Sequence, residues 1–327
     1  MAEPAVRHVC FDSYGPPSVL QLAHRDDPLP GDGQVLVEVS AAGVNFVDVF
    51  QRSGAYTVQF PFTPGFEGSG VVLQAGAGVT GVAAGDRVAW AGCPASYASH
   101  CIAAAGRLVP VPDGVSLRDA ATAMVHGMTA HFLASDVVPL GPGMTCLVLA
   151  AAGGVGGLLC QLAAARGATV VGVVSQPGKE EAAQAAGATH VIVTSRERTA
   201  VRVRELTGGE GVNVVYDGVG RDTFADSLAS LHPRGTLVLY GQTSGPVTAV
   251  DPQELNRQGS VFFTKPSLGH YDRTREDLLR RAAEVLRLVT DATLRLRLHA
   301  EYPLADAAAA HQALESRTVT GKLLLRP

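Results

Sequence analysis

A glycine-rich run at residues 150–157 of this 327-residue chain, AAAGGVGG, has the composition needed to hold a phosphate. Glycines let the backbone approach a pyrophosphate closely, and the N–H groups at the start of a helix attract its negative charge. In the G-x-G-x-x-G pattern Ala151 takes the first place, with Gly153 and Gly156 in the others. Close packing of a helix on a strand also selects small residues, and this is the alternative explanation. The strand before and the helix after favour a dinucleotide site.

The residues that follow the glycines indicate which dinucleotide is bound. A site for NAD usually has an acidic residue about 20 positions past the glycines, which binds the ribose 2′-hydroxyl. Here the next strand ends in Val174 and Ser175, and Lys179 follows shortly after. A hydroxyl and an ammonium would hold a 2′-phosphate that a carboxylate would repel. The sequence therefore favours NADPH, although Lys179 could also be a solvated lysine beside Glu180 and Glu181.

The elements that must position these residues alternate between strand and helix after about residue 119. We expect helical patterns of about ten residues between the first five strands and a long helix from about Arg273 to Thr290, and strands separated by helices form a parallel sheet. The apolar run around the glycines is long enough to span a membrane, but the glycines divide it into a strand and a helix. The predicted strands cover residues 145–150, 169–174, 190–193, 213–217, 236–240 and 260–264.

The N-terminal third reads as β structure, and the composition narrows the class of protein. Val35, Val37 and Val39 fall on one face of a predicted strand and Glu38 and Ser40 on the other, as in a half-buried strand, and residues 85–90 follow the same pattern. The charged fraction is 17% and the net charge is −4, so nucleic acid is not an expected partner. The five cysteines lack paired spacing and the N-terminus lacks an apolar leader, which favours a cytoplasmic protein without a membrane segment.

Several motifs in a fixed order resemble the quinone oxidoreductases of the zeta-crystallin type, within the medium-chain dehydrogenase/reductase superfamily. The motifs are AAGVNFVDVFQRSGAY, TPGFEGSG, GMTA, AAAGGVGG, VVYDGVGRDTF, TKPSL and ALESRTVTGKLLLRP. The resemblance implies an α/β fold, in which a Rossmann domain binds NADPH and a GroES-like β-rich domain carries the catalytic residues. The Rossmann domain would cover residues 126–265, and the GroES-like domain residues 1–125 and 266–327. NADPH would lie in the cleft between them, and the family typically forms homodimers.

The resemblance also implies which residues contact the cofactor. We add Asn45 and Tyr56 as candidates for a hydrogen bond to the oxyanion that hydride transfer creates, although Asn45 could only position the cofactor and Tyr56 could only pack. Two positions depart from the family: Thr194 stands where a tyrosine often holds the 2′-phosphate, with Arg196 and Arg198 close behind, and Phe50 replaces a frequent tyrosine. The implied cofactor contacts are Asn45, Thr129, Gly153, Gly154, Val155, Ser175, Lys179, Thr194, Val219, Tyr240, Gln242, Ser244, Lys265, Ser267, Leu268 and Arg317.

The zinc ligands of the alcohol-oxidising relatives are replaced in this chain. Those relatives use Cys and His in motifs such as G-V-C-H and G-H-E, where this chain has Asn45 and Phe66. Neither an amide nor a phenyl ring can replace thiolate and imidazole around Zn²⁺. His100 and Cys101 are adjacent in a predicted strand, so their side chains point to opposite faces and cannot form a site with Cys93. We therefore expect no metal.

Without a metal to polarise a carbonyl, the substrate must accept hydride readily by itself. Quinones do so, and NADPH-dependent quinone reduction is the first hypothesis. Reduction of an enone or enoyl double bond in the same site is the second. A third hypothesis is that the protein is not an efficient enzyme but binds NADPH in a structural or regulatory role. Phe50, in place of a frequent tyrosine, is the feature that supports it.

Overall fold

The computed structural model describes residues 6–327, which form two compact units. Unit 1 contains the described residues up to Val125, together with Asp272–Ala292 and Leu296–Pro327. Unit 2 contains His126–Tyr271 and Thr293–Arg295. Residues 266–271, which the sequence analysis placed in the first domain, belong to unit 2 here. One reason is that the ring of Tyr271 stacks on Phe132, with 4.4 Å between the ring centroids.

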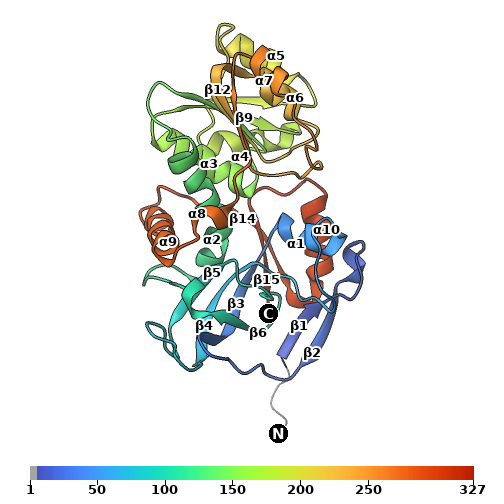
Figure 1. The fold of residues 1–327 in the computed structure, drawn as a ribbon, viewed down its shortest axis with the longest axis vertical. Coiled ribbons are helices and arrows are strands. Elements are labelled where there is room, and N and C mark those ends of the chain that lie inside the picture. Colours follow the sequence, from blue (N-terminus) through green and yellow to red (C-terminus); the bar gives the residue numbers. More distant parts are fainter. Residues whose placement is uncertain (1–5) are drawn as a thin grey trace. The chain divides into compact units, whose positions relative to one another are not determined.

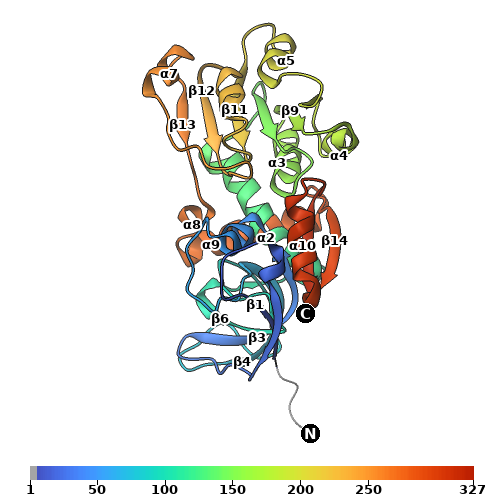
Figure 2. The same cartoon turned by 90° about the vertical axis from the view of Figure 1, so that its right-hand side faces the viewer.

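Unit 2 is built on a parallel sheet with the strand order β10-β9-β8-β11-β12-β13. This is the 3-2-1-4-5-6 order of a Rossmann domain, and it confirms the predicted α/β fold. Figure 2 shows β13 at one side of this sheet and β9 toward the other. The strands are β8 (Thr145–Leu149), β9 (Thr169–Val174), β10 (His190–Val193), β11 (Val212–Asp217), β12 (Leu231–Leu239) and β13 (Phe262–Thr264).

The helices of unit 2 connect successive strands, but two of them are shorter than the sequence pattern predicted. Helices α4 and α6 have 6 residues each instead of about ten. Pro177 opens a 3₁₀ turn before α4, which uses up part of the available chain. Strand β13 begins two positions late because Ser260 has a left-handed φ of 57°. The helices are α3 (Gly154–Ala165), α4 (Glu180–Ala185), α5 (Thr199–Leu206), α6 (Phe224–Ala229), α7 (Pro252–Arg257) and α8 (Leu268–Tyr271).

Unit 1 is a β-rich domain whose main sheet follows the order β14-β15-β3-β4-β5-β7, with β6 also paired to β3. The red strand β15 lies beside the blue strand β3 in Figure 1, although the two are far apart in the sequence. The strands are β1 (Val6–Cys10), β2 (Gln21–Arg25), β3 (Gln34–Val44), β4 (Glu67–Ala75), β5 (Arg87–Ala91), β6 (His100–Ala104), β7 (Val109–Pro110), β14 (Leu298–Pro303) and β15 (Lys322–Arg326).

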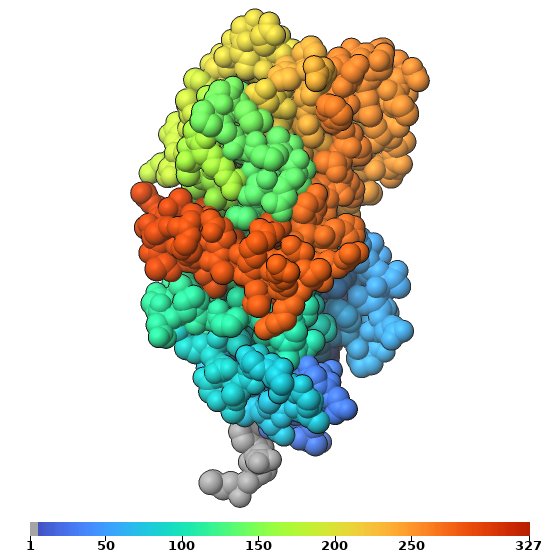
Figure 3. Space-filling view, turned by 60° about the vertical axis from the view of Figure 1, so that its left-hand side comes forward, coloured from blue at the N-terminus to red at the C-terminus, as the bar shows by residue number. Residues whose placement is uncertain are grey.

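Two helices of unit 1 lie against strands of this sheet: α10 contacts β14 and β15, and α9 contacts β7. The long helix predicted from about Arg273 to Thr290 is found as α9 (Arg275–Thr290). Thr274 caps this helix, because its hydroxyl accepts the Asp277 N–H at 3.1 Å. In Figure 3 the orange-red α9 lies against the teal segment that contains β7. The helices are α1 (Phe46–Ser53), α9 (Arg275–Thr290) and α10 (Ala307–Glu315), while α2 (Leu117–Phe132) contains the boundary between the units. In unit 1 short 3₁₀ turns occupy Pro17–Val19, Ala105–Arg107 and Leu304–Asp306, whereas in unit 2 a π-helix follows α2 at Leu133–Val137 and a 3₁₀ turn occupies Pro177–Lys179.

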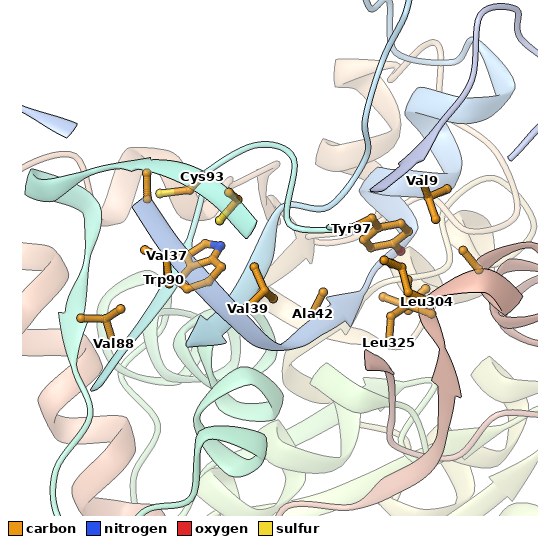
Figure 4. Close-up of a cluster of buried hydrophobic side chains, with 14 of the residues drawn as sticks. Val9, Val37, Val39, Ala42, Val88, Trp90, Cys93, Tyr97, Leu304 and Leu325 are labelled. Atoms are coloured by element: carbon orange, nitrogen blue, oxygen red, sulfur yellow. The ribbon is translucent and has the colours of Figure 1, made fainter. Parts of the chain in front are cut away.

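Each unit has its own apolar core. In unit 1 Val35, Val37 and Val39 are buried and Glu38 and Ser40 are exposed, as predicted, although Leu36 is buried as well. Figure 4 shows Trp90 beside Val37, while Tyr97 lies near Leu304 and Leu325. The core of unit 2 gathers side chains from its sheet and helices, among them Leu147, Val171, Ile192, Val215 and Leu237. No helix within residues 6–327 has the length and apolarity that crossing a membrane requires.

Candidate cofactor and substrate half-sites

The glycine turn of unit 2 joins β8 to α3, and two of its glycines leave no space for a side chain. A Cβ on Gly156 would lie 2.3 Å from the carbonyl oxygen of Ala150, and one on Gly154 would lie 2.0 Å from Nδ1 of His126. Gly153 is the N-cap of α3, whose first turn carries no acidic residue. The N–H groups of Gly154, Val155 and Gly156 have no acceptor among residues 6–327. Such a turn fits a pyrophosphate, as the sequence predicted.

The residues expected at the 2′-phosphate lie at the carboxyl ends of β9 and β10. Ser175 directly follows β9, and the N–H of Thr194 donates to the carbonyl of Val174 at 3.0 Å, which ties the two strand ends together. Lys179 ends the 3₁₀ turn after β9, and partial burial lowers the pKa of its ammonium. A partly desolvated ammonium suits a phosphate dianion, and the hydroxyls of Ser175 and Thr194 stand at the ends of the two neighbouring strands.

Two arginines near Thr194 form ion pairs instead of pointing freely to solvent. Arg196 Nη1 lies 3.1 Å from Glu180 Oε1, and Arg198 Nη2 lies 3.2 Å from Asp226 Oδ1. Both guanidinium groups are largely exposed, so these pairs contribute little to stability. A phosphate could replace Glu180 as the partner of Arg196 at small cost.

A third group of expected contacts lies at the ends of β11 and β12, where Asp217 organises the turn. Its buried carboxylate accepts the N–H of Val219 at 2.8 Å and the hydroxyls of Thr223 and Ser227 at 2.7 Å each. The hydroxyl of Ser244 donates to the carbonyl of Val219 at 2.8 Å. The strand order thus brings Val219 and Ser244, two of the expected cofactor contacts, together.

The remaining expected contacts of unit 2 lie nearby on loops and on α2. Lys265 Nζ donates to Gln242 Oε1 at 3.3 Å, and burial lowers the pKa of this ammonium. Burial raises the pKa of the Tyr240 hydroxyl, which therefore stays neutral. Ser267 is exposed and Leu268 begins α8, while Thr129 is half-buried in α2.

In unit 1, Asn45 lies where three neighbouring strands meet. It directly follows β3, whereas Glu67 begins β4 and Lys322 begins β15. Because β4 and β15 both run antiparallel to β3, the start of each lies beside the end of β3. Lys322 Nζ donates to Asn45 Oδ1 at 2.7 Å and to the carboxylate of Glu67. Asn45 Nδ2 donates to Glu67 Oε2 at 3.0 Å and to the carbonyl of Gly43 at 3.2 Å.

A second buried polar cluster adjoins Asn45. The Asp48 carboxylate accepts the N–H of Asn45 at 2.9 Å and the hydroxyl of Tyr97 at 3.2 Å, and desolvation raises the pKa of Asp48 to about 7. The Tyr97 oxygen lies 3.1 Å from Nε2 of His311, and burial lowers the pKa of His311 to about 3. A neutral imidazole that donates from Nε2 leaves Nδ1 without a proton, and Nδ1 indeed has no partner among the described residues.

Tyr56 belongs to a row of aromatic rings on and after α1. Its ring meets Phe50 edge to face, with 5.3 Å between centroids, and Phe50 lies 6.0 Å from Phe46. Tyr56 is 44% exposed, and its hydroxyl has no hydrogen-bond partner in the described chain. Phe50 therefore supplies an apolar surface while Tyr56 keeps an available donor. Arg317, expected near the cofactor, is exposed and has a left-handed φ of 61° after α10.

The residues at the former zinc positions form no metal site. Asn45 is committed to Lys322 and Glu67, and Phe66 offers no ligand atom. Within residues 6–327 there is no group of three or more His, Cys, Asp or Glu side chains that could hold a metal ion. All five cysteines are free thiols, and burial raises the pKa of Cys93 to about 11.

Sequence reasoning did not identify Glu67 and Lys322 as functional candidates. Each is a charged residue at the start of a mostly apolar strand, and both side chains are buried. A charge in that position is rare unless it is paired, and this was the available signal. The pairing itself could not be seen, because 255 residues separate the two positions.

Comparison with known proteins identifies the class. The alcohol dehydrogenase GroES-like domain family matches residues 31–136, and the zinc-binding dehydrogenase family matches residues 154–284. The quinone oxidoreductase of Pseudomonas aeruginosa is 41% identical over 98% of this chain and 99% of its own length. A 2-haloacrylate reductase from a Burkholderia species is 38% identical over 91% of this chain and 92% of its own.

Solved structures agree with this result. The crystal structure of Escherichia coli quinone oxidoreductase complexed with NADPH has a TM-score of 0.96 and 38% identity, covering 98% of this chain and all of that one. The two units thus define a medium-chain dehydrogenase/reductase with a GroES-like and a Rossmann domain. Within that superfamily, the chain belongs to the quinone oxidoreductase family, as the motifs indicated.

Proposed function

We propose that this protein reduces quinones with NADPH by hydride transfer and without a metal. The observation that carries the proposal is the bare glycine turn at α3 combined with Lys179 in the 3₁₀ turn after the neighbouring strand β9. The turn can receive a pyrophosphate, and the ammonium can receive a 2′-phosphate. The proposed reaction joins a quinone, NADPH and a proton to give a hydroquinone and NADP⁺.

The residues of the chain would bind and orient, while the cofactor would supply the chemistry. When bound, NADPH supplies the hydride from its nicotinamide ring. Gly153, Gly154 and Val155 would hold the pyrophosphate, with Ser175 and Lys179 at the 2′-phosphate. The remaining contacts proposed in unit 2 are Thr129, Thr194, Val219, Tyr240, Gln242, Ser244, Lys265, Ser267 and Leu268. In unit 1, Asn45 and Arg317 would contact the cofactor.

The substrate half of the proposal rests on unit 1. The row of aromatic rings from Phe46 to Tyr56 offers a flat apolar surface suited to a quinone ring. Tyr56 would donate a hydrogen bond to the oxygen on which negative charge develops. A quinone accepts hydride without a Lewis acid, which agrees with an amide and a phenyl ring in place of zinc ligands.

A steady-state screen tests the proposal. NADPH and NADH are offered with quinones, enones, 2-haloacrylates and alcohols, with and without a chelator. We expect turnover of quinones with NADPH that the chelator does not change. Faster turnover of enones or 2-haloacrylates would assign the protein to double-bond reduction instead. Tight NADPH binding by calorimetry without turnover of any acceptor would indicate a binding protein.

We also propose that the protein is a cytoplasmic homodimer that pairs through β13. This strand is an edge of the described sheet of unit 2, and Phe262 on it is 61% exposed. An uncovered edge with an exposed aromatic ring favours pairing with a second copy. Phe262→Asp should convert a dimer into a monomer in light scattering. Val201→Asp, at an exposed apolar position on α5, is the control and should leave the mass unchanged.

A further inference from the structure

Asn45, Glu67 and Lys322 form a buried cluster in the main sheet of unit 1, where β3 ends and β4 and β15 begin. Their relative exposures are 4%, 0% and 2%, so the ammonium and the carboxylate interact in a medium of low dielectric. A Cβ on Gly43 would lie 2.1 Å from Glu67 Oε2 and 2.9 Å from Cε of Lys322. Glycine at this position therefore allows the cluster to close.

The two charges determine how the Asn45 amide is oriented. Its oxygen faces the Lys322 ammonium, and its nitrogen faces the Glu67 carboxylate and the carbonyl of Gly43. The reversed amide would place N–H groups against an ammonium and an oxygen against a carboxylate, and both contacts would be repulsive. One orientation is thus strongly favoured. The same contacts occupy both N–H groups of the amide.

We propose that Lys322 and Glu67 are positioning residues for hydride transfer, and that they act by holding Asn45 in this single orientation. This inference rests on the proposed function, in which Asn45 contacts the bound cofactor. Asn45 then contributes a fixed surface to the site. Because both of its amide N–H groups are occupied, the hydrogen bond to the developing oxyanion comes from Tyr56. Loss of the two charges releases the amide and loosens the alignment on which the rate of hydride transfer depends.

The test is the double variant Glu67→Gln/Lys322→Met, which removes both charges and leaves no unpaired buried ion. We expect kcat with NADPH and a quinone to fall about 10- to 100-fold, the size of effect that a misplaced reacting group produces. The KM for NADPH should change less than about threefold, because the phosphate contacts lie in unit 2. The isotope effect from deuterium at the transferred position should increase, since hydride transfer becomes slower.

Arg52→Met/Glu315→Gln is the matched control. Arg52 is as buried as Lys322, and its two nitrogens lie 2.8 Å from the two carboxylate oxygens of Glu315. We expect this control to lower the melting temperature while kcat stays within about twofold of wild type, since it touches no reacting group. Gly43→Ala, which keeps both charges and displaces their side chains, should lower kcat like the first variant.

The outcomes separate the inference from the proposed function. If the wild-type protein turns over quinone and the two double variants have the same kcat, the positioning role is wrong. Should Glu67→Gln/Lys322→Met fail to fold, an unchanged kcat in Gly43→Ala would overturn the inference equally. Absence of wild-type turnover would contradict the proposed function itself, and the inference would fall with it.

Discussion

The two half-sites differ in the groups that form them: backbone N–H groups in unit 2, and charged and polar side chains in unit 1. In unit 2 the turn before α3 is bare backbone without a charged side chain, and its affinity for an anion comes from N–H groups. In unit 1 the site around Asn45 holds buried carboxylates, an ammonium and an imidazole, which are hydrogen-bonded to Asn45, to Tyr97 or to one another. The turn in unit 2 can therefore bind a charged ligand, whereas the charged groups in unit 1 bond to neighbouring residues of the protein. We infer that binding energy comes mainly from unit 2 and alignment mainly from unit 1.

The largest expected effect tests the backbone site. Gly156→Ala places a Cβ 2.3 Å from a backbone oxygen that cannot rotate away. NADPH affinity measured by calorimetry should fall about 100-fold or more, a loss of about 2.7 kcal/mol. Gly157→Ala is the control, because its Cβ would lie at an ordinary 3.5 Å from its nearest neighbour. Equal losses in the two variants would show that the close approach is unimportant.

A smaller effect is expected from the cation of unit 2. Lys179→Ala removes a charge-assisted contact to the 2′-phosphate, so the dissociation constant for NADPH should rise about 10- to 100-fold. The constant for NADH, which lacks this phosphate, should hardly change. Arg202→Ala, on the exposed face of α5, serves as the control for general charge. An equal change for both coenzymes would refute the assignment of Lys179.

The next smaller effect is expected on kcat, from the row of aromatic rings from Phe46 to Tyr56 in unit 1. Tyr56→Phe removes a hydroxyl that has no partner in the described chain, and kcat for quinones should fall about tenfold. Tyr14→Phe is the matched control, since the Tyr14 hydroxyl is already bonded to the backbone of Val58, accepting its N–H at 3.0 Å. A normal kcat in the Tyr56 variant would leave that ring with a packing role.

The smallest effect is expected in the net pH dependence of stability, because two buried groups contribute in opposite directions. His311 has a pKa of about 3 in the folded protein and 6.5 ordinarily, so between these values only the unfolded chain binds the proton. Stability is then lost as pH falls from 6.5 to 3, by up to about 1.4 kcal/mol per pH unit. His311→Gln should remove this contribution, so that urea titrations of the variant show only the opposite contribution of Asp48. The raised pKa of Asp48 acts in the opposite direction, because it lowers stability as pH rises from 3.8 to about 7.

The sequence predicted unit 2 better than the chemistry of unit 1 for a physical reason. Strand β8, the glycines and α3 are adjacent in the chain, and their period and composition reveal them locally. Strand β12 starts five positions earlier than expected because Leu231 pairs with Val212 across a bulge. The Asn45 cluster joins residues 277 positions apart, so no local pattern reveals it. Only the resemblance placed the C-terminal residues in the same domain as Asn45.

Strand β15 also constrains the order in which the molecule can fold. It lies between β14 and β3, yet the whole of His126–Tyr271 separates it from β3 along the chain. On the ribosome, the continuous unit 2 is synthesised before the strand that completes the sheet of unit 1. The Rossmann domain can therefore fold first. Until β15 is synthesised, β3 of the β-rich domain lacks its neighbour on that side. Catalytic alignment is the last property that the newly made chain acquires.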